Sequence, residues 1–445
     1  MTFDAAERRA EGRTKPASMA LEVQTSLDSR KIPQLEVLGE RDLQERRVVA
    51  SVLPFRVNNY VIDSLIDWKS VPDDPIFRLV FPARDMLDEQ SFALMKKAVN
   101  NGNSDEIKSV ARKIRSDLNP HPADQLSLNR PIYDGEQISG LQHKYAETVL
   151  FFPSEGQSCH SYCTFCFRWP QFVRDQDLRI AMSDRDLLVS YISEHSEITD
   201  LLITGGDAFT MKARRLRFFL EPFAQPRLKH VTTIRFGTKA LSFWPYRFVT
   251  DSDADEIIDL IRWLSSVGKQ VAIMAHYNHR RELETSIAQA AIERLRSAGA
   301  ILRSQGPILR QINDDSAVWQ NLWRRQVELG IVPYYMFLAR DTGPRDYFSV
   351  PLARAWDIYS KAANQLSGLG RTARGPSMSS GPGKIEVIGV AEVMGERVFV
   401  LRFLQSRDPS WSFKPFFAKY DETAIWLDQL RPAFGEEEFF FERRA

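Results

Sequence analysis

The sequence predicts an α/β fold in which a parallel sheet forms a partial, open (β/α)6 barrel, with an α-rich region before it and an α+β segment after it. Between residues 148 and 338, short apolar runs recur about every 30 residues, and each is followed by a helical pattern. This alternation is typical of repeated βαβ units and therefore of a parallel sheet. Because six units are fewer than the eight of a closed barrel, we expect the sheet to remain open.

The elements of the predicted barrel follow in a regular order. The expected strands are 148–152, 200–204, 231–237, 270–276, 301–304 and 333–338. The expected helices begin at Ser183, which has Asp186 three positions on as a weak capping box, and continue with 212–223, 253–266, 284–298, 317–329 and 352–366. Ligands of parallel sheets bind beyond the carboxyl ends of the strands, so we expect the functional site there.

We expect four segments: a mobile N-terminal arm over 1–35, an α-rich region over 36–144, the barrel over 145–367 and a C-terminal segment over 368–445. The arm is polar and charged without a sustained period. Helical patterns at 88–99 and 105–118 characterise the second segment, and the proline-rich stretch 119–122 interrupts it. The last segment begins with a stretch rich in Gly, Ser, Pro and Arg, has strand-like runs at 384–390 and 397–404, and is expected to cover the barrel mouth.

The composition is that of an ordinary soluble protein, with 43% hydrophobic and 26% charged residues and a net charge of +1. Near-neutrality provides no argument for a nucleic-acid or membrane partner. No apolar run approaches the ~20 residues that span a bilayer, and the N-terminus lacks the pattern of a signal peptide. Three cysteines do not make a disulfide framework, so we expect a reducing, cytoplasmic location.

The three cysteines, Cys159, Cys163 and Cys166, form a Cys-x3-Cys-x2-Cys pattern. They could be unconnected thiols, a zinc site completed by His160, or ligands of an iron–sulfur cluster. His160 directly follows Cys159, which suits a tetrahedral zinc poorly, and the sequence has no second Cys-x2-Cys pair. Clusters commonly have four cysteines. Three thiolates therefore favour a [4Fe-4S] cluster whose fourth iron is open to a small molecule.

A second motif, Gly205-Gly206-Asp207, ends the strand expected at 200–204. Alone it is most often a plain β–α turn. Glycines let backbone approach a ligand closely, and backbone carbonyls with Asp207 could accept hydrogen bonds from an ammonium group. Phe165, just before the last cysteine, could pack its face on a ligand ring.

The spacing of the cysteines, with an aromatic before the last one, resembles the radical S-adenosylmethionine (SAM) superfamily, and further motifs resemble its lysine 2,3-aminomutase family. The matching segments are 159–168, 202–207, 234–239, 276–279, 304–314, 333–335 and 381–385, in family order over more than half of the chain. The resemblance implies a radical SAM barrel that uses a [4Fe-4S] cluster, SAM and pyridoxal 5′-phosphate (PLP). It implies an isomerase that moves the α-amino group of a free amino acid to the β-carbon through a 5′-deoxyadenosyl radical. We also expect an electron donor such as flavodoxin or ferredoxin, and a homo-oligomer.

The resemblance also assigns roles to residues. It implies that Cys159, Cys163 and Cys166 hold the cluster, and that Phe165, Gly205, Gly206, Asp207 and Gln305 contact SAM. Arg168 matches the arginine that grips the substrate carboxylate, a task for which the guanidinium fork is suited. Lys384 matches the lysine that binds PLP covalently. His276 and His279 match a turn for which a structural and a cofactor-contacting role are equally compatible.

The chain also departs from this family. Two arginines that help to hold PLP are replaced by Lys144 and Thr148, and the cysteines of a structural zinc site are absent, so we expect that zinc to be absent too. Two aspartates that bind the ε-ammonium of lysine align with Arg340 and Ser377. Placing an ammonium beside Arg340 would cost several kcal/mol in a dry site.

We therefore expect a non-basic substrate such as glutamate or aspartate, whereas a shift of one residue would put Asp341 in that place and restore a basic one. Two other functions stay open from the sequence. One is a radical SAM enzyme with another outcome (decarboxylation, deamination or epimerisation), and the other is a non-enzymatic iron–sulfur or zinc protein.

Overall fold

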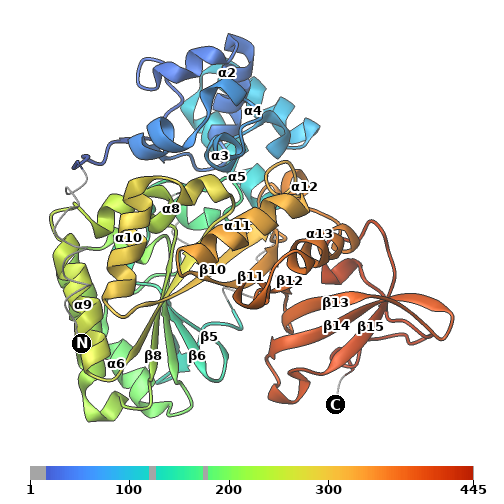
Figure 1. Cartoon of the computed structure of the whole chain (residues 1–445). Helices are drawn as coiled ribbons and strands as arrows, with labels where there is room; N and C mark the ends of the chain where they lie inside the picture. Colours follow the sequence, from blue (N-terminus) through green and yellow to red (C-terminus); the bar gives the residue numbers. More distant parts are fainter. Residues whose placement is uncertain (1–16, 120–126, 174–178, 444–445) are drawn as a thin grey trace.

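An eleven-stranded sheet forms the centre of the protein in the computed structural model, which describes residues 17–119, 127–173 and 179–443. The strand order is β15-β14-β13-β12-β11-β10-β9-β8-β7-β6-β5. Strands β6 to β12 run parallel to one another, β5 (Leu141–Tyr145) pairs antiparallel at one end, and β13 to β15 pair antiparallel at the other. Helices pack beside this sheet, so the fold is mixed α/β (Figure 1).

The strand–helix alternation expected from the sequence is confirmed. The parallel strands are β6 (Thr148–Phe151), β7 (Asp200–Ile203), β8 (Thr233–Thr238), β9 (Gln270–His276), β10 (Ile301–Ile308), β11 (Val332–Leu338) and β12 (Arg374–Ser379). The helices between them are α6 (Arg185–Glu194), α7 (Ala213–Leu220), α8 (Ala240–Phe243), α9 (Ala254–Ser266), α10 (Ser286–Ser297), α11 (Ser316–Glu328), α12 (Arg345–Phe348) and α13 (Leu352–Asn364).

Three details differ from the expectation. Strand β12 is a seventh parallel strand inside the Gly- and Pro-rich stretch, where Gly375 has φ +140° and a Cβ would lie 2.3 Å from the carbonyl oxygen of Met336. The glycine and proline in this stretch suggested a loop, whereas the glycine is required because β12 packs closely on β11. Strand β10 continues four residues beyond its expected end, and α6 is capped by Asp184, which accepts a hydrogen bond from the Leu187 N–H (2.9 Å), rather than by Ser183.

The N-terminal region contains α2 (Glu40–Ala50), α3 (Pro75–Val80), α4 (Glu89–Asn101) and α5 (Ser104–Leu118), drawn in blue at the top of Figure 1. It also has the short pair β1 (Val23–Gln24) and β2 (Val57–Asn58). The first 16 residues of the predicted arm lie outside the described residues, whereas Leu27 and Ile32 are buried in the core of this region. The same core includes Phe243 at the end of α8 and Phe348 at the end of α12, so the region packs directly on these short helices.

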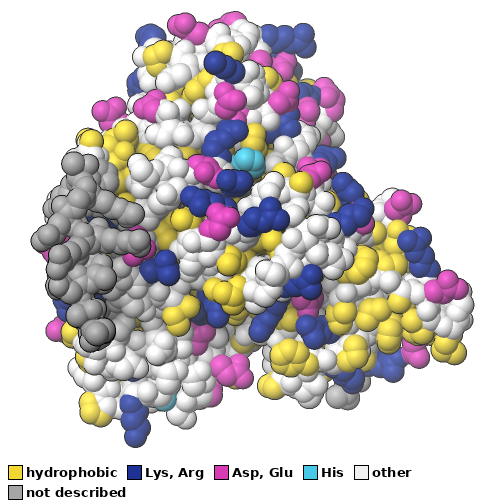
Figure 2. All heavy atoms as spheres, viewed as in Figure 1, with side chains coloured by type: hydrophobic (Ala, Val, Ile, Leu, Met, Phe, Trp, Pro, Cys, Tyr) yellow, Lys and Arg dark blue, Asp and Glu magenta, His cyan; other side chains and the backbone are white. Residues whose placement is uncertain are grey.

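The C-terminal region extends the sheet with β13 (Gly383–Val393), β14 (Glu396–Ser406) and β15 (Pro415–Lys419). Before β5, the strands β3 (Ile132–Tyr133) and β4 (Glu136–Gln137) form a separate two-stranded antiparallel sheet. Hydrophobic side chains gather on the face over the C-terminal strands in Figure 2, and Ile388, Met394 and Phe413 of this region are exposed. No helix within the described ranges is long and apolar enough to cross a membrane.

Candidate functional site

A cavity of about 620 Å³ is lined by side chains from β5 to β14. It brings together the residues that the resemblance assigns to the cluster, to the other cofactors or to the substrate: Cys159, Cys163, Phe165, Cys166, Arg168, Gly205, Gly206, Asp207, Gln305, Arg340, Ser377 and Lys384. Lys144, Thr148 and His276 line it too. Segments more than 200 residues apart in the sequence therefore share one cavity.

The cysteine loop follows β6 and is held by the N-terminal region. The N-terminal region provides buried backbone and amide partners where the loop has no regular structure of its own. Hydrogen bonds of this attachment run from the Tyr162 N–H to the Arg56 carbonyl (2.8 Å), from the Thr164 N–H to the Leu79 carbonyl (2.8 Å), and from the Asn58 side chain to the His160 carbonyl (3.3 Å).

The three cysteines are half-buried and line this cavity. Burial raises the pKa of Cys166 to about 11 and raises that of Cys159 well above its usual range. Such thiols keep their protons until a metal replaces them. Among the described residues, no three His, Cys, Asp or Glu side chains converge on a point for a single metal ion. Burial lowers the pKa of His160 to about 3, so its ring is neutral.

The Gly-Gly-Asp turn packs against the segment that leads into the cysteine loop. Gly205 has φ +140°, and a Cβ on Gly206 would lie 2.2 Å from the carbonyl oxygen of Ser158. The N–H groups of Gly206 and Asp207 both donate to the Gly156 carbonyl (3.2 Å each). The glycines therefore allow two loops to meet, and their contact with SAM stays a prediction.

The carboxylate of Asp207 is buried and already accepts hydrogen bonds from protein donors. These donors are the Thr238 hydroxyl (2.8 Å), the Lys239 N–H (2.8 Å) and the Phe209 N–H (3.0 Å). Asp207 thus joins the end of β7 to the end of β8, which was not expected from the sequence.

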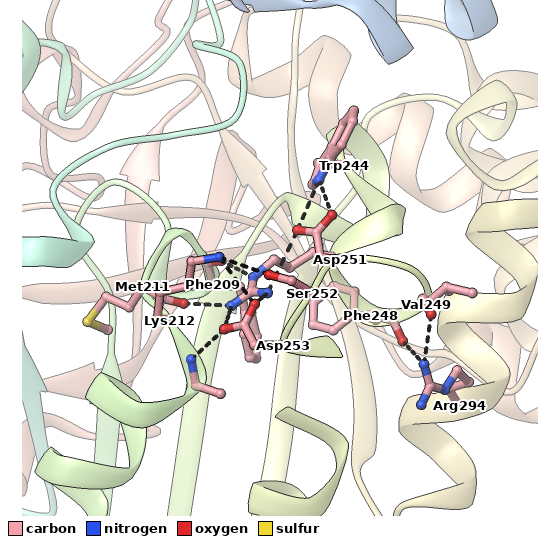
Figure 3. A network of polar contacts seen from close by, with 12 residues as sticks. Phe209, Met211, Lys212, Trp244, Phe248, Val249, Asp251, Ser252, Asp253 and Arg294 are labelled. Atoms are coloured by element: carbon pink, nitrogen blue, oxygen red, sulfur yellow. Dashed lines mark hydrogen bonds and ion pairs between the residues drawn. The ribbon is translucent and has the colours of Figure 1, made fainter. Parts of the chain in front are cut away.

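A buried ionic network fixes the segment after this turn (Figure 3). The guanidinium of Arg247 donates to the carbonyls of Phe209 and Met211 (2.7 Å each) and to the carboxylate of Asp253 (2.6 and 3.0 Å). A charge-assisted, bidentate pair of this kind is both strong and directional. The segment that follows the turn is therefore held in place by this network.

Phe165, His276 and Gln305 lie together at the carboxyl ends of β9 and β10. The rings of Phe165 and His276 are 5.5 Å apart, and Gln305 pairs with His276 in the ladder between these strands. Burial lowers the pKa of His276 well below its usual range, and its Nε2 has no hydrogen-bond partner in the part of the chain that the structure describes. His279 does not line the cavity; its Nδ1 accepts from the Arg281 N–H (3.2 Å) and caps a turn.

Lys384 emerges near the start of β13, opposite Ser379 on β12 and Gln405 on β14. Its Nζ lies 4.3 Å from the ring centre of Tyr335 and 5.6 Å from that of Phe337. Burial lowers the pKa of Lys384 to about 8, and the nearby charges of arginines contribute to this shift. A lysine with such a pKa has a sizeable neutral fraction near pH 8 and can attack a carbonyl carbon.

Arg168 and Arg340 both pack on Phe167, with each guanidinium carbon 5.1 Å from the ring centre. Arg340 also lies 5.8 Å from the ring centre of Trp426, and its Nε donates to Asp341 (3.2 Å). Within the described ranges, Arg168 Nη1 and Arg340 Nη2 are buried without a hydrogen-bond partner. Burial, with the charge of Arg340, lowers the pKa of Arg168 to about 10, which leaves the Arg168 guanidinium cationic at neutral pH. The cavity therefore presents two incompletely paired cations to a ligand.

The alternative position for the substrate side chain, Asp341, does not line the cavity, whereas Arg340 does. Ser377 is fully buried, and its hydroxyl lies 3.4 Å from the Met336 carbonyl. Arg340 and Ser377, which the resemblance aligns with two aspartates, thus both line the cavity.

Sequence reasoning missed several contributors to the site. Phe167 and Tyr335 lie inside the matched motifs, so their proximity to the cavity could have been inferred. Asn58 and Trp426 lie far from those motifs, and no local pattern marks them. Only the folded chain brings Asn58 to the cysteine loop and Trp426 to Arg340.

No protein-family model matches the chain, but several known proteins with related names are similar to it in sequence. The chain is 31% identical over 403 residues to a protein of Aquifex aeolicus named "Putative L-lysine 2,3-aminomutase", covering 90% of this chain and 94% of the relative. It is 26% identical to the L-lysine 2,3-aminomutase of Bacillus subtilis over 54% of this chain and 48% of that one. It is 29% identical over 211 residues, 47% of each chain, to the glutamate 2,3-aminomutase of Clostridioides difficile.

Proposed function

The chain belongs to the lysine 2,3-aminomutase family of radical SAM enzymes, and from this membership we propose that it moves the α-amino group of glutamate or aspartate to the β-carbon. The family makes it an isomerase acting on an amino acid. The substrate class and the dependence on PLP are the proposed parts.

The pair of buried guanidiniums carries the proposal. One carboxylate of a dicarboxylic amino acid would bind Arg168 and the other Arg340, and each would meet the nitrogen that has no partner among the described residues. A guanidinium left unpaired in a buried site is costly, and a carboxylate removes that cost. The ammonium of lysine in the same place would add a third cation, at a cost of several kcal/mol.

The residues present fit the family's cofactors. Three half-buried cysteines line the cavity for a [4Fe-4S] cluster, and the unpaired Nε2 of His276 and the loop of Gly205 and Gly206 line the same cavity for SAM. Lys384, with its lowered pKa, faces the same cavity for PLP. When bound, the cluster and SAM supply a carbon-centred radical that takes hydrogen from the β-carbon, and PLP carries the migrating nitrogen.

The chain's own residues would bind and orient the substrate and shield the reactive amine from water. Arg168 directly follows the cysteine loop, so a carboxylate held there anchors the amino acid next to the loop. Tyr335 and Phe337 pack on the amine of Lys384 and limit its access to water. Arg340, fixed by Phe167 and Asp341, selects the far end of the substrate.

We also propose that the parallel strands curve into the partial radical SAM barrel of the family. Strands β6 to β14 all contribute residues to one cavity of about 620 Å³. At about 4.8 Å between neighbours, nine flat strands would extend over more than 35 Å. Only a strongly curved sheet brings all of them to a common cavity.

Direct turnover tests the proposal. The protein is reconstituted anaerobically with iron, sulfide, SAM, PLP and a reductant, then given glutamate, aspartate, alanine or lysine. We expect β-amino isomers from glutamate or aspartate, detected by mass spectrometry together with 5′-deoxyadenosine. Faster isomerisation of lysine would reject the substrate class, and cleavage of SAM without any β-amino isomer would reject the reaction.

A further inference from the structure

The turn of residues 380–383 joins β12 to β13 and directly precedes Lys384. It is closed by the N–H and hydroxyl of Ser380, which both donate to the Gly383 carbonyl (2.9 and 3.1 Å). Arg407 holds it from the C-terminal side: its Nε donates to the Gly381 carbonyl (2.9 Å) and its backbone N–H to the Pro382 carbonyl (3.0 Å). The backbone that presents Lys384 is thus restrained at successive carbonyls.

Lys144 holds the same turn from the other flank of the sheet. Its Nζ donates to the Ser380 carbonyl (2.5 Å), although β5 and β13 lie on opposite sides of the seven parallel strands in the strand order. A second bond joins the same flanks, from Arg407 Nη2 to the Asn129 side-chain oxygen (2.5 Å). Asn129, Lys144 and Lys384 all line the cavity, so this junction is part of its wall.

We propose that Lys144 is a positioning residue for Lys384, which holds the 380–383 turn so that the amine of Lys384 is presented at the correct place for an aldehyde. The inference rests on the proposed function, because it takes Lys384 as the PLP lysine. Lys144 stands where the family carries an arginine that helps to hold PLP, and a role in binding the phosphate is the competing interpretation.

The two interpretations differ in what they predict for an aldehyde without a phosphate. Lys384 would form a carbon–nitrogen double bond with the aldehyde carbon of PLP or of pyridoxal, with release of one water molecule in each case. A phosphate ligand matters for PLP alone. A residue that positions Lys384 matters equally for both aldehydes.

The experiment measures the affinity of the full-length protein for PLP and for pyridoxal, from the absorbance of the carbon–nitrogen double bond. Lys144→Gln and Arg407→Gln are compared with the unmodified protein, Lys144→Arg serves as conservative rescue, and Lys414→Gln is a matched control outside the cavity. We expect Lys144→Gln to weaken both aldehydes in parallel by about tenfold or more, because a hydrogen bond from a charged donor is lost. Arg407→Gln should weaken both in parallel to a lesser extent, and Lys144→Arg should restore most of the affinity.

Each outcome decides. Loss of affinity for PLP alone would assign Lys144 to the phosphate and overturn the proposal, as would unchanged affinity for both aldehydes. If Lys144→Gln does not fold, Arg407→Gln still tests the turn, and unchanged affinities in that variant reject the positioning role. If the unmodified protein binds neither aldehyde covalently, the proposed function fails instead, and Lys384→Ala identifies the amine when it does bind.

Discussion

The two ends of the cavity are constructed differently. At the cysteine end, the chain is held by the N-terminal region and by neighbouring turns, as in the bonds from the Tyr162 N–H to the Arg56 carbonyl and from the Lys239 N–H to the Asp207 carboxylate. At the lysine end, the wall includes charged side chains, and Arg340 retains a nitrogen without a partner among the described residues. The cysteine loop, which the family shares, is therefore held largely by backbone hydrogen bonds. The proposed choice of substrate depends instead on a few side chains that can change without altering the fold.

Replacing a cysteine should have the largest effect. Cys163→Ala removes one cluster ligand, so we expect loss of all turnover and of SAM cleavage, with iron content and visible absorbance reduced after reconstitution. Lys384→Ala is the control from the other end: it should keep the cluster while losing amino migration. Normal iron binding by Cys163→Ala would contradict the assignment.

Lys384→Met should separate function from stability. Since the folded pKa of about 8 lies below the ordinary 10.5, the unfolded chain binds this proton more readily. The lysine therefore destabilises the fold below pH 8, and this cost fades as the pH rises to 10.5. We expect amino migration to disappear and the free energy of unfolding to rise by about 2 kcal/mol at pH 7, with little gain near pH 10.5. Denaturant titrations at both pH values measure this, and an equal gain at both would refute the cause.

Arg340→Asp reverses a charge at the lysine end only. We expect kcat/KM for glutamate or aspartate to fall about 100-fold or more, because the second carboxylate then meets an anion. Turnover of lysine should rise relative to that of glutamate, while cluster content stays unchanged. The matched variant Arg345→Asp, on a side chain that does not line the cavity, should leave the substrate preference as it was.

Asn58→Ala perturbs the cysteine end through its support. The buried Asn58 side chain donates to the carbonyls of His160 and Phe243 (3.3 and 2.8 Å). Removing it should cost about 2 kcal/mol of stability and lower the yield of reconstituted cluster severalfold, without a change in substrate preference. Asn59→Ala, at the adjacent and more exposed position, is the control, and equal effects of both would argue against the support.

The smallest effect is a pH dependence at the lysine end. Only the neutral amine of Lys384 attacks an aldehyde, so the rate of covalent PLP binding should rise with pH and level off above about 8. Stopped-flow absorbance between pH 6 and 10 measures it. A midpoint of this pH dependence near 10.5 would show that burial does not lower the pKa of Lys384.

The sequence predicted the parallel strands β6 to β11 because each is a compact apolar run with a helical pattern after it. It did not predict β12, because close packing on β11 selects Gly375 and Pro376, which read as a loop. The site residues were found where motifs carry them, as with Cys159 and Lys384. The support from Asn58 and the junction of Lys144 with Ser380 depend on contacts across more than 100 residues, which local patterns do not encode.

The placement of Lys384 beyond the parallel strands has a consequence for the protein during its synthesis. The ribosome delivers the cysteine loop more than 200 residues before this lysine, and chains fold from their N-terminal parts as they emerge. A chain interrupted after β11 would hold the cysteines and Arg168 but lack the amine and the strands that close the wall. Covalent binding of PLP would therefore require a chain translated beyond Lys384, whereas the cysteines of the cluster are made much earlier.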